Sequence, residues 1–337
     1  MRSGILAAGN WIRDHVMVVD SWPAEDGLAN ILSQSEANGG GPYNVLKDLS
    51  RLGAPFPLAG LGIVGDDAKG RAILAECREL GVDAARLRVD PDSSTSFTEV
   101  ITVRGTGRRT FFHHRGANAQ LGPGDFDFTG AGQRLFYLGY LFLLDGLDAA
   151  GPDGAPAARD VLRRARSAGL QTSLDCVSAA TDPSWEAARA VLPEVDVLFA
   201  NEYEAGGLSG HPLALGGAVD RGAIETVARA LVGHGVRRWA VVHFPAGACA
   251  CSGAGDLVWQ PAVRVRPELI AGSVGAGDAL SAGVLFGVHE GWPIERSLEL
   301  GVCAAAASLL HPTCSEGVLS HGDCIAFGQS QGFASFS

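Results

Sequence analysis

Short apolar runs alternate along most of the chain with amphipathic stretches of helical length. The apolar runs are rich in Val, Leu and Phe, have the length of buried strands, and cover residues 4–9, 57–64, 134–140, 170–175, 195–200 and 238–243. Between them, apolar positions recur with the spacing of one helix face over residues 43–52, 68–80, 157–168, 223–235, 276–290 and 294–310. Strands that alternate with helices pair in parallel and bury both faces. The pattern therefore predicts an α/β fold, a three-layer αβα sandwich around a mainly parallel sheet.

Two parts of the chain break this rhythm, because strand-like runs occur there without an intervening helix. Residues 15–20 form one such run, and residues 96–103 and 109–114 form a pair joined by a Gly-rich turn. We expect these strands to build a small β lid, drawn from about residues 11–38 and 93–116. A lid of this kind excludes water from a reaction. It also offers a surface through which two copies of the chain could form a homodimer.

The composition and charge of the chain narrow its range of partners. Its 337 residues are 47% hydrophobic and 19% charged, so it can bury a large core. The formal net charge of -11 disfavours nucleic acid, whose phosphates require a basic face. No apolar run is long enough to span a bilayer, and Asn10, Arg13 and Asp14 interrupt the one near the start. We therefore expect a cytoplasmic protein that binds small molecules, with no nucleic acid and no membrane as partners.

Cysteine and histidine positions give little support to a metal or disulfide site. The seven cysteines show neither a CxxC pair nor the spacing of a small disulfide-rich domain, so we expect them to be reduced and mostly buried. Cys249 and Cys251 alternate on an expected strand and face the same way, but no further ligand lies nearby. Adjacent His113 and His114 would point to opposite faces of a strand, which disfavours one shared ion.

Small residues lead directly into the long apolar helix predicted at 276–290. They leave backbone amides open to a ligand, so Gly275, Ala276 and Gly277 are predicted to form an anion hole at the helix start. Asp278, in the first turn, would accept a hydroxyl proton while the amides stabilise charge on a transferring phosphoryl group. The same residues also suit a tight turn with Asp278 as a helix cap. The residues alone favour neither interpretation.

Two further segments carry polar side chains just after expected strands. Asn201 and Glu204 follow the strand predicted at 195–200, and ligands gather at the carboxyl ends of strands in open α/β sheets. The alternative for this pair is an Asn cap with Glu in the first helical turn. In the expected lid, Arg115 and Asn118 could reach a bound substrate or phosphate.

The order of these motifs resembles that of the ribokinase-like, or PfkB-type, carbohydrate kinases. The GAGD run at 275–278 is similar to the family's C-terminal signature, in which it supplies an anion hole and the catalytic base. Residues 38–45 and 62–70 resemble the family's GG and VGxDxxG segments, and residues 201–204 resemble its NxxE motif. Several weak motifs in the family's order are much less expected by accident than any one of them. The likeness spans most of the chain and implies one kinase domain over residues 1–337.

The resemblance implies ATP-dependent phosphoryl transfer to a hydroxyl of a sugar or sugar-like small molecule, with Asp278 as the base and with ATP and Mg²⁺ as cofactors. The family's motifs assign further roles by position: for the acceptor, Asp14, Gly39, Gly40 and Asn44; for Mg²⁺ and its waters, Asn201 and Glu204; for the nucleotide, His243 and Gly247.

The sequence departs from the family pattern at three places. Gly272 and Ser273 stand where the family usually has Asp-Thr, so a carboxylate that often supports a monovalent-cation site is missing and potassium activation is doubtful. The nucleotide loop at 242–247 keeps only the last glycine of the usual TxGxxG. Val177 stands where sugar kinases often carry Asn two residues after Asp175. ATP as the phosphoryl donor therefore rests on the resemblance.

Other functions stay open on these grounds. The departures leave room for a non-catalytic sugar- or nucleotide-binding protein on the same fold, and Gly9-Asn10 is also compatible with a nucleoside kinase. Residues 60–65 match GxGxxG, which would indicate an NAD(P)-dependent enzyme, but they follow a later strand rather than opening the first βαβ unit. No GxxxxGK[ST] sequence occurs, which excludes the P-loop kinases.

Overall fold

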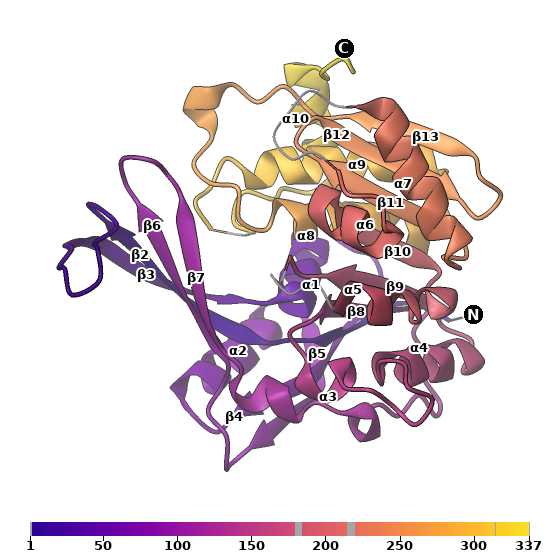
Figure 1. Ribbon diagram of the computed structural model, residues 1–337, viewed down its shortest axis with the longest axis horizontal. Coiled ribbons are helices and arrows are strands. Elements are labelled where there is room, and N and C mark those ends of the chain that lie inside the picture. The colour runs from indigo at the N-terminus through magenta and orange to yellow at the C-terminus, as the bar shows by residue number, and fades with distance from the viewer. Residues whose placement is uncertain (1, 179–183, 214–219, 314, 337) are drawn as a thin grey trace.

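The computed structural model describes residues 2–178, 184–213, 220–313 and 315–336. Their strands form a nine-stranded and a four-stranded sheet (Figure 1). The large sheet has the order β13-β12-β11-β10-β9-β8-β1-β4-β5 and is parallel except for the antiparallel pairs at β12. Its strands are β1 (Ile5–Gly9), β4 (Leu58–Gly65), β5 (Val82–Asp90), β8 (Leu135–Leu141), β9 (Gln171–Cys176), β10 (Val197–Asn201), β11 (Trp239–Phe244), β12 (Gly247–Ser252) and β13 (Leu257–Pro261). The predicted mainly parallel α/β sheet is confirmed.

Helices cover both faces of the large sheet, and alternate side chains of each central strand enter the two resulting cores. Ile5 and Ala7 of β1 belong to one core, whereas Leu6 and Ala8 belong to the other. The first core is closed by α1 (Gly41–Arg51), α2 (Ala68–Glu79), α8 (Ala276–Glu290), α9 (Ile294–Ser308) and α10 (His321–Gln331). The second is closed by α3 (Asp145–Asp148), α4 (Ala158–Ser167), α5 (Ser184–Arg189), α6 (Glu202–Ser209) and α7 (Arg221–Gly233). Burial on both faces is why the strands read as continuous apolar runs.

The four-stranded sheet projects from the body as two hairpins (Figure 1). Its order is β3-β2-β6-β7, with bounds β2 (Ile12–Val19), β3 (Ile31–Gly39), β6 (Phe97–Val103) and β7 (Arg109–His114). The expected small sheet is therefore present. Its strand β3 gave no pattern in the sequence, because the first six of its residues are exposed and its side chains are mostly polar.

Two alternative interpretations of the sequence are decided by packing. All three glycines of the GxGxxG match lie within β4, and a Cβ atom on Gly60 or Gly62 would lie 2.6 or 2.3 Å from the Trp11 ring. Gly60 and Gly62 make room for the Trp11 indole, and all three glycines belong to a strand instead of a phosphate-binding turn, so the dinucleotide interpretation is wrong. Cys249 and Cys251 face the same core and are fully buried as free thiols, as packing predicts.

Among the described helices, none combines the length and apolarity needed to cross a membrane.

Candidate active site

The polar side chains of interest converge where α8 begins, beside the carboxyl ends of β1, β8, β9 and β10. Gly275 precedes α8 with a φ of 78°, in the left-handed region that favours glycine. No side chain caps the helix there, so the amides of its first turn remain open. An uncapped helix start of this kind can bind an anion. The geometry thus agrees with the anion hole predicted at Gly275, Ala276 and Gly277.

Asp278 is held in this first turn with its carboxylate oriented by two hydrogen bonds. The Tyr140 hydroxyl donates to Oδ1 at 2.5 Å, and the Asn44 amide donates to Oδ2 at 2.9 Å. The residue is only 5% exposed, and this burial raises the pKa of Asp278 to about 6, against the opposing effect of the two hydrogen bonds. A carboxylate with a pKa just below neutral is mostly ionised at pH 7 and well placed to accept a proton.

The residues predicted for the acceptor lie opposite Asp278. Asp14 comes from β2, and burial together with the charge of Asp278 raises its pKa to about 7. Asn44, in the first turns of α1, has a buried Oδ1 with no partner among the described residues. Gly39 ends β3 directly against the Asp14 carboxylate, and Gly40 is the N-cap of α1. The structure thus brings all four predicted acceptor residues to one side of Asp278.

Gly39 offers a test of this side of the site. A Cβ at this position would lie 2.2 Å from Asp14 Oδ2, so Gly39→Ala must displace the Asp14 carboxylate. We expect the acceptor KM to rise about tenfold or more, because one or two hydrogen bonds between the acceptor and a charged group are lost. The ATP KM should not change. Gly105→Ala, where a Cβ meets nothing within 4 Å, is the control. Equal acceptor KM values for the two variants would contradict this placement.

Asn201 and Glu204 form a reciprocal capping box at the start of α6. Asn201 Oδ1 accepts from the Glu204 amide, and Glu204 Oε2 accepts from the Asn201 amide, both at 3.0 Å. The Ser178 hydroxyl donates to Glu204 Oε1 at 2.8 Å. Burial raises the pKa of Glu204 to about 7, with a smaller contribution from the charge of Asp278. The cap interpretation is therefore correct. The capping Glu204 is also a buried carboxylate near Asp278 whose raised pKa makes its charged form less favourable.

A cavity of about 460 Å³ lies on the other side of the α8 start. Its lining is mostly apolar and includes His243 and Gly247, the two residues predicted for the nucleotide, together with Ala276 and Gly277. A Cβ on Gly277 would lie 3.2 Å from His243 Cε1, so the imidazole packs on the backbone of the helix start. Burial lowers the pKa of His243 to about 4, which keeps it neutral.

The two lid-proximal residues predicted for the substrate are engaged by protein groups. Both amide atoms of the fully buried Asn118 bond to the backbone of Trp11, at 3.2 and 3.1 Å. Asn118 therefore fixes the connection between β1 and β2. Arg115 pairs with Asp145 at 2.9 Å and is partly exposed, so its contact with a substrate stays a prediction.

Comparison with known proteins shows the family and the fold of the chain. The model of the pfkB family carbohydrate kinases matches residues 3–320. The chain belongs to this kinase family. An ATP-dependent ribose-1-phosphate kinase of Halopiger xanaduensis is 28% identical over 298 residues, covering 88% of each chain. The solved ribokinase of Giardia lamblia superimposes with a TM-score of 0.81 at 18% sequence identity. The solved ribokinase of Arabidopsis thaliana, complexed with ribose and ATP, superimposes with a TM-score of 0.78 at 19% identity. Each comparison covers 98% of this chain and 99% of the other chain.

Tyr140 is a site residue of this kinase that the sequence motifs did not identify. It stands at the end of the apolar run predicted as a strand, in β8, and it lies 138 residues from Asp278, to which it donates. Its position at the carboxyl end of a parallel strand is the one signal that could have found it. Tyr137 and Ser281 similarly donate to the buried Asp175, at 3.2 and 3.3 Å.

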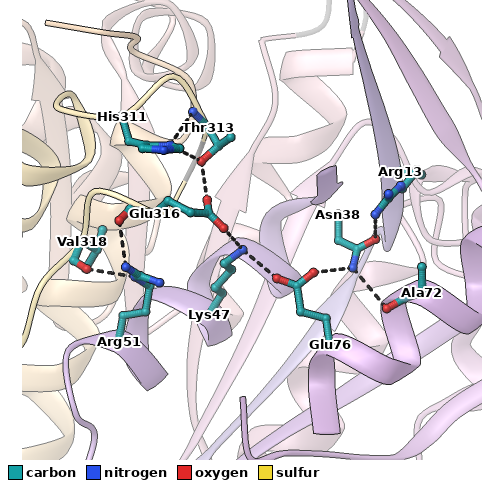
Figure 2. Close-up of polar contacts among 10 residues, drawn as sticks. All are labelled: Arg13, Asn38, Lys47, Arg51, Ala72, Glu76, His311, Thr313, Glu316 and Val318. Atoms are coloured by element: carbon teal, nitrogen blue, oxygen red, sulfur yellow. Dashed lines mark hydrogen bonds and ion pairs between the residues drawn. The ribbon is translucent and has the colours of Figure 1, made fainter. Parts of the chain in front are cut away.

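A buried lysine of the kinase ties three segments together behind the site (Figure 2). Lys47 Nζ lies 2.7 Å from Glu76 of α2 and 2.5 Å from Glu316, which follows α9. The Asn38 amide donates to Glu76 at 2.7 Å and so links the end of β3 to this group. Arg51 donates to the carbonyl of Glu316 at 2.8 Å. The loop that contains Glu316 also packs on Gly272, just before the helix start.

Proposed function

We propose that this kinase transfers the γ-phosphoryl group of ATP to a hydroxyl of a sugar or sugar-like small molecule, with Asp278 as the general base. The observation that carries the proposal is the position of Asp278. It is a buried carboxylate with a raised pKa, in the first turn of a helix with open amides, and it faces the polar groups of Asp14 and Asn44. A helix cap alone does not require two side-chain donors oriented on the carboxylate.

The chemistry follows from this arrangement. The acceptor hydroxyl, bound between Asp14 and Asn44, gives its proton to Asp278 as its oxygen forms a bond to the γ-phosphorus. The bond between that phosphorus and the β–γ bridging oxygen breaks, and ADP leaves. The amides of Gly275, Ala276 and Gly277 stabilise the charge on the transferring group. Tyr140 and Asn44 hold the carboxylate in place, so little reorganisation is needed at the moment of transfer.

Mg²⁺ fits the proposal as an ion held through the triphosphate and water. The described residues contain no group of three His, Cys, Asp or Glu side chains able to hold a metal ion by themselves. Glu204 and Asn201 would bind the waters of the ion, and its positive charge would offset the cost of keeping Glu204 and Asp175 ionised side by side. When bound, Mg²⁺ supplies charge neutralisation at the phosphates. Because Gly272 offers no carboxylate, we do not propose activation by potassium.

We propose that residues 1–337 work as one domain and that the four-stranded sheet acts as its lid. Large apolar side chains on this sheet and its hairpin loop are exposed, and Trp22 stacks on Phe112 with ring centroids 6.4 Å apart. Leu28 is 87% exposed. Exposed apolar groups in one small region mark association surfaces, so we also propose a homodimer through the lid, which light scattering would test.

Acceptor-dependent ADP release tests the proposed function directly. The purified chain with ATP and Mg²⁺ would be given pentoses, hexoses, sugar phosphates and nucleosides in parallel. The Halopiger relative is named for ribose 1-phosphate, so that compound leads the series. We expect at least one sugar-like acceptor to stimulate ADP release well above the rate with water alone. Ligand binding without ADP release for every acceptor would instead support a non-catalytic binding protein.

The acid side of the pH profile should report Asp278. Its carboxylate must be ionised to accept a proton, and its pKa in the folded protein is about 6 instead of the usual 3.8. We therefore expect kcat/KM for the acceptor to fall as the pH drops through about 6 to 7, where Asp14 also becomes protonated. A profile that stays flat down to pH 5 would contradict both pKa shifts.

A further inference from the structure

Among the described residues that line the proposed nucleotide cavity, none is Lys or Arg, although a triphosphate carries several negative charges. Its lining is apolar apart from Glu202, Ser273 and the neutral His243. The neighbouring carboxylates, Asp278 and Glu204, add negative charge to the same region. Open amides and a bound Mg²⁺ would neutralise part of the phosphate charge, but no Lys or Arg among the described residues lining the cavity would assist them.

One cation does reach the edge of this cavity, and it comes from the small sheet. The Arg109 guanidinium donates to the Ser273 hydroxyl at 2.6 Å, across 164 residues of sequence. Ser273 lines the cavity and lies two residues before Gly275. The Arg109–Ser273 contact lies at the surface, so the guanidinium is free to exchange a hydroxyl for a better acceptor. Phosphate oxygens are such acceptors, because a guanidinium matches their geometry and charge.

Strand register places Arg109 on the same face of the small sheet as Asp14. Asp14 of β2 pairs with Thr98 of β6, which pairs with His113 of β7, so these three side chains share one face of the small sheet. The 2.9 Å contact between Thr98 Oγ1 and His113 Nδ1 confirms the shared face. Arg109 lies four residues before His113 on β7 and therefore projects from the same face as Asp14. Asp14 in turn lies close enough to Asp278 for their charges to interact.

We propose that Arg109 is a catalytic residue that binds the γ-phosphoryl group of ATP from the lid side during transfer. This inference rests on the proposed function. As the acceptor oxygen bonds to the γ-phosphorus and the bond to the β–γ bridging oxygen breaks, the guanidinium stabilises the equatorial oxygens and exchanges no proton itself. Because Arg109 belongs to the lid, a lid displaced from the site would take this positive charge away with it. Transfer to water in the open state is thereby disfavoured.

Nucleotide binding tests this assignment without requiring turnover. Arg109 is expected to contact the γ-phosphate, which a non-hydrolysable ATP analogue has and ADP lacks. The ratio of analogue affinity to ADP affinity should therefore be higher for the wild type than for Arg109→Met. We expect the variant to lose about 10- to 100-fold in affinity for the analogue, and little for ADP, since ADP lacks the contacted group. The neighbouring Arg108→Met is the matched control, because Arg108 precedes β7 and is neither the residue that contacts Ser273 nor among the described residues that line the cavity.

Turnover with an identified acceptor gives the second measurement. For Arg109→Met we expect kcat to fall by about 10²- to 10³-fold with the acceptor KM unchanged, the usual size of one lost donor to a transition-state charge. Arg109→Lys should recover part of the lost kcat, and Arg108→Met should have the kcat of the wild type. An Arg109→Met variant with wild-type kcat and analogue affinity, or with only a raised acceptor KM, would overturn the proposal. A wild type that binds nucleotide but phosphorylates no acceptor would count against the proposed function instead.

Discussion

Replacing Asp278 with asparagine should lower kcat by about 10²- to 10⁴-fold, the range that a positioned general base contributes. In the wild type Tyr140 and Asn44 donate to the two carboxylate oxygens, at 2.5 and 2.9 Å. Asn keeps the shape of the side chain: its single oxygen can accept from the Asn44 amide, and its NH₂ group can donate to the Tyr140 hydroxyl. It cannot take up the hydroxyl proton. The loss should therefore appear in kcat measured by acceptor-dependent ADP release, with nucleotide affinity preserved or increased because one buried negative charge has gone.

The control for this variant is an aspartate with no role in the site. Asp66→Asn removes a carboxylate that is 61% exposed and that pairs at the surface with Arg71. It should retain wild-type kcat. A kcat for Asp278→Asn within a few-fold of that of Asp66→Asn would show that another group accepts the proton.

Replacing Lys47 with methionine should destabilise the fold more than any other single change of a charged pair in the described structure. The Lys47 side chain is 8% exposed, and its loss leaves Glu76 and Glu316 without their shared partner. Breaking a fully buried pair costs 3–5 kcal/mol in general, but these glutamates are 29% and 37% exposed and regain some hydration, so we expect about 1–3 kcal/mol. Equilibrium unfolding in urea at pH 7 measures this change in the free energy of unfolding.

The pH dependence of stability provides an independent check on the same contact. Burial raises the pKa of Glu316, but hydrogen bonds from Lys47 and Thr313 lower it by more than burial raises it. The resulting pKa is about 2, compared with an ordinary value of 4.5. A depressed pKa stabilises the folded state above pH 4.5, and this contribution is lost as the pH falls toward 2. In Lys47→Met, the part of the free energy of unfolding that is lost between pH 4.5 and pH 2 should be smaller. The control is Arg71→Met, which breaks an exposed pair and should cost at most about 0.5 kcal/mol; equal losses in the two variants would contradict the role of Lys47.

Much of the fold could be predicted because burial leaves a periodic signal. The central strands are apolar on both faces, so β1, β4, β8, β9, β10 and β11 could be predicted to within two residues at each end. The signal fails at edges: β5 alternates buried positions with charged ones, and β3 is exposed along most of its length. Neither strand buries enough apolar surface to mark the sequence.

The candidate site divides in the same way. Asp278, Gly39 and Asn44 lie in compact motifs that resemble family signatures, and that resemblance is what predicted them to share one site. Tyr140, Arg109 and Lys47 act through contacts 138, 164 and 269 residues away, and a single sequence carries no trace of such pairings. For Asn201 and Glu204 the sequence offered both a role near Mg²⁺ and a helix cap, and the coordinates show the reciprocal cap.

The most direct test of the account is the product formed when ATP, Mg²⁺ and an acceptor are bound together in a single turnover. With enzyme in excess, the quenched reaction would be analysed by mass spectrometry for the phosphorylated acceptor, in the wild type and in Asp278→Asn. The account predicts one phosphate ester on an acceptor hydroxyl in the wild type and at least about a hundredfold slower formation in the variant. Formation of the ester at the same rate by both proteins, or of free phosphate alone by the wild type, would contradict it.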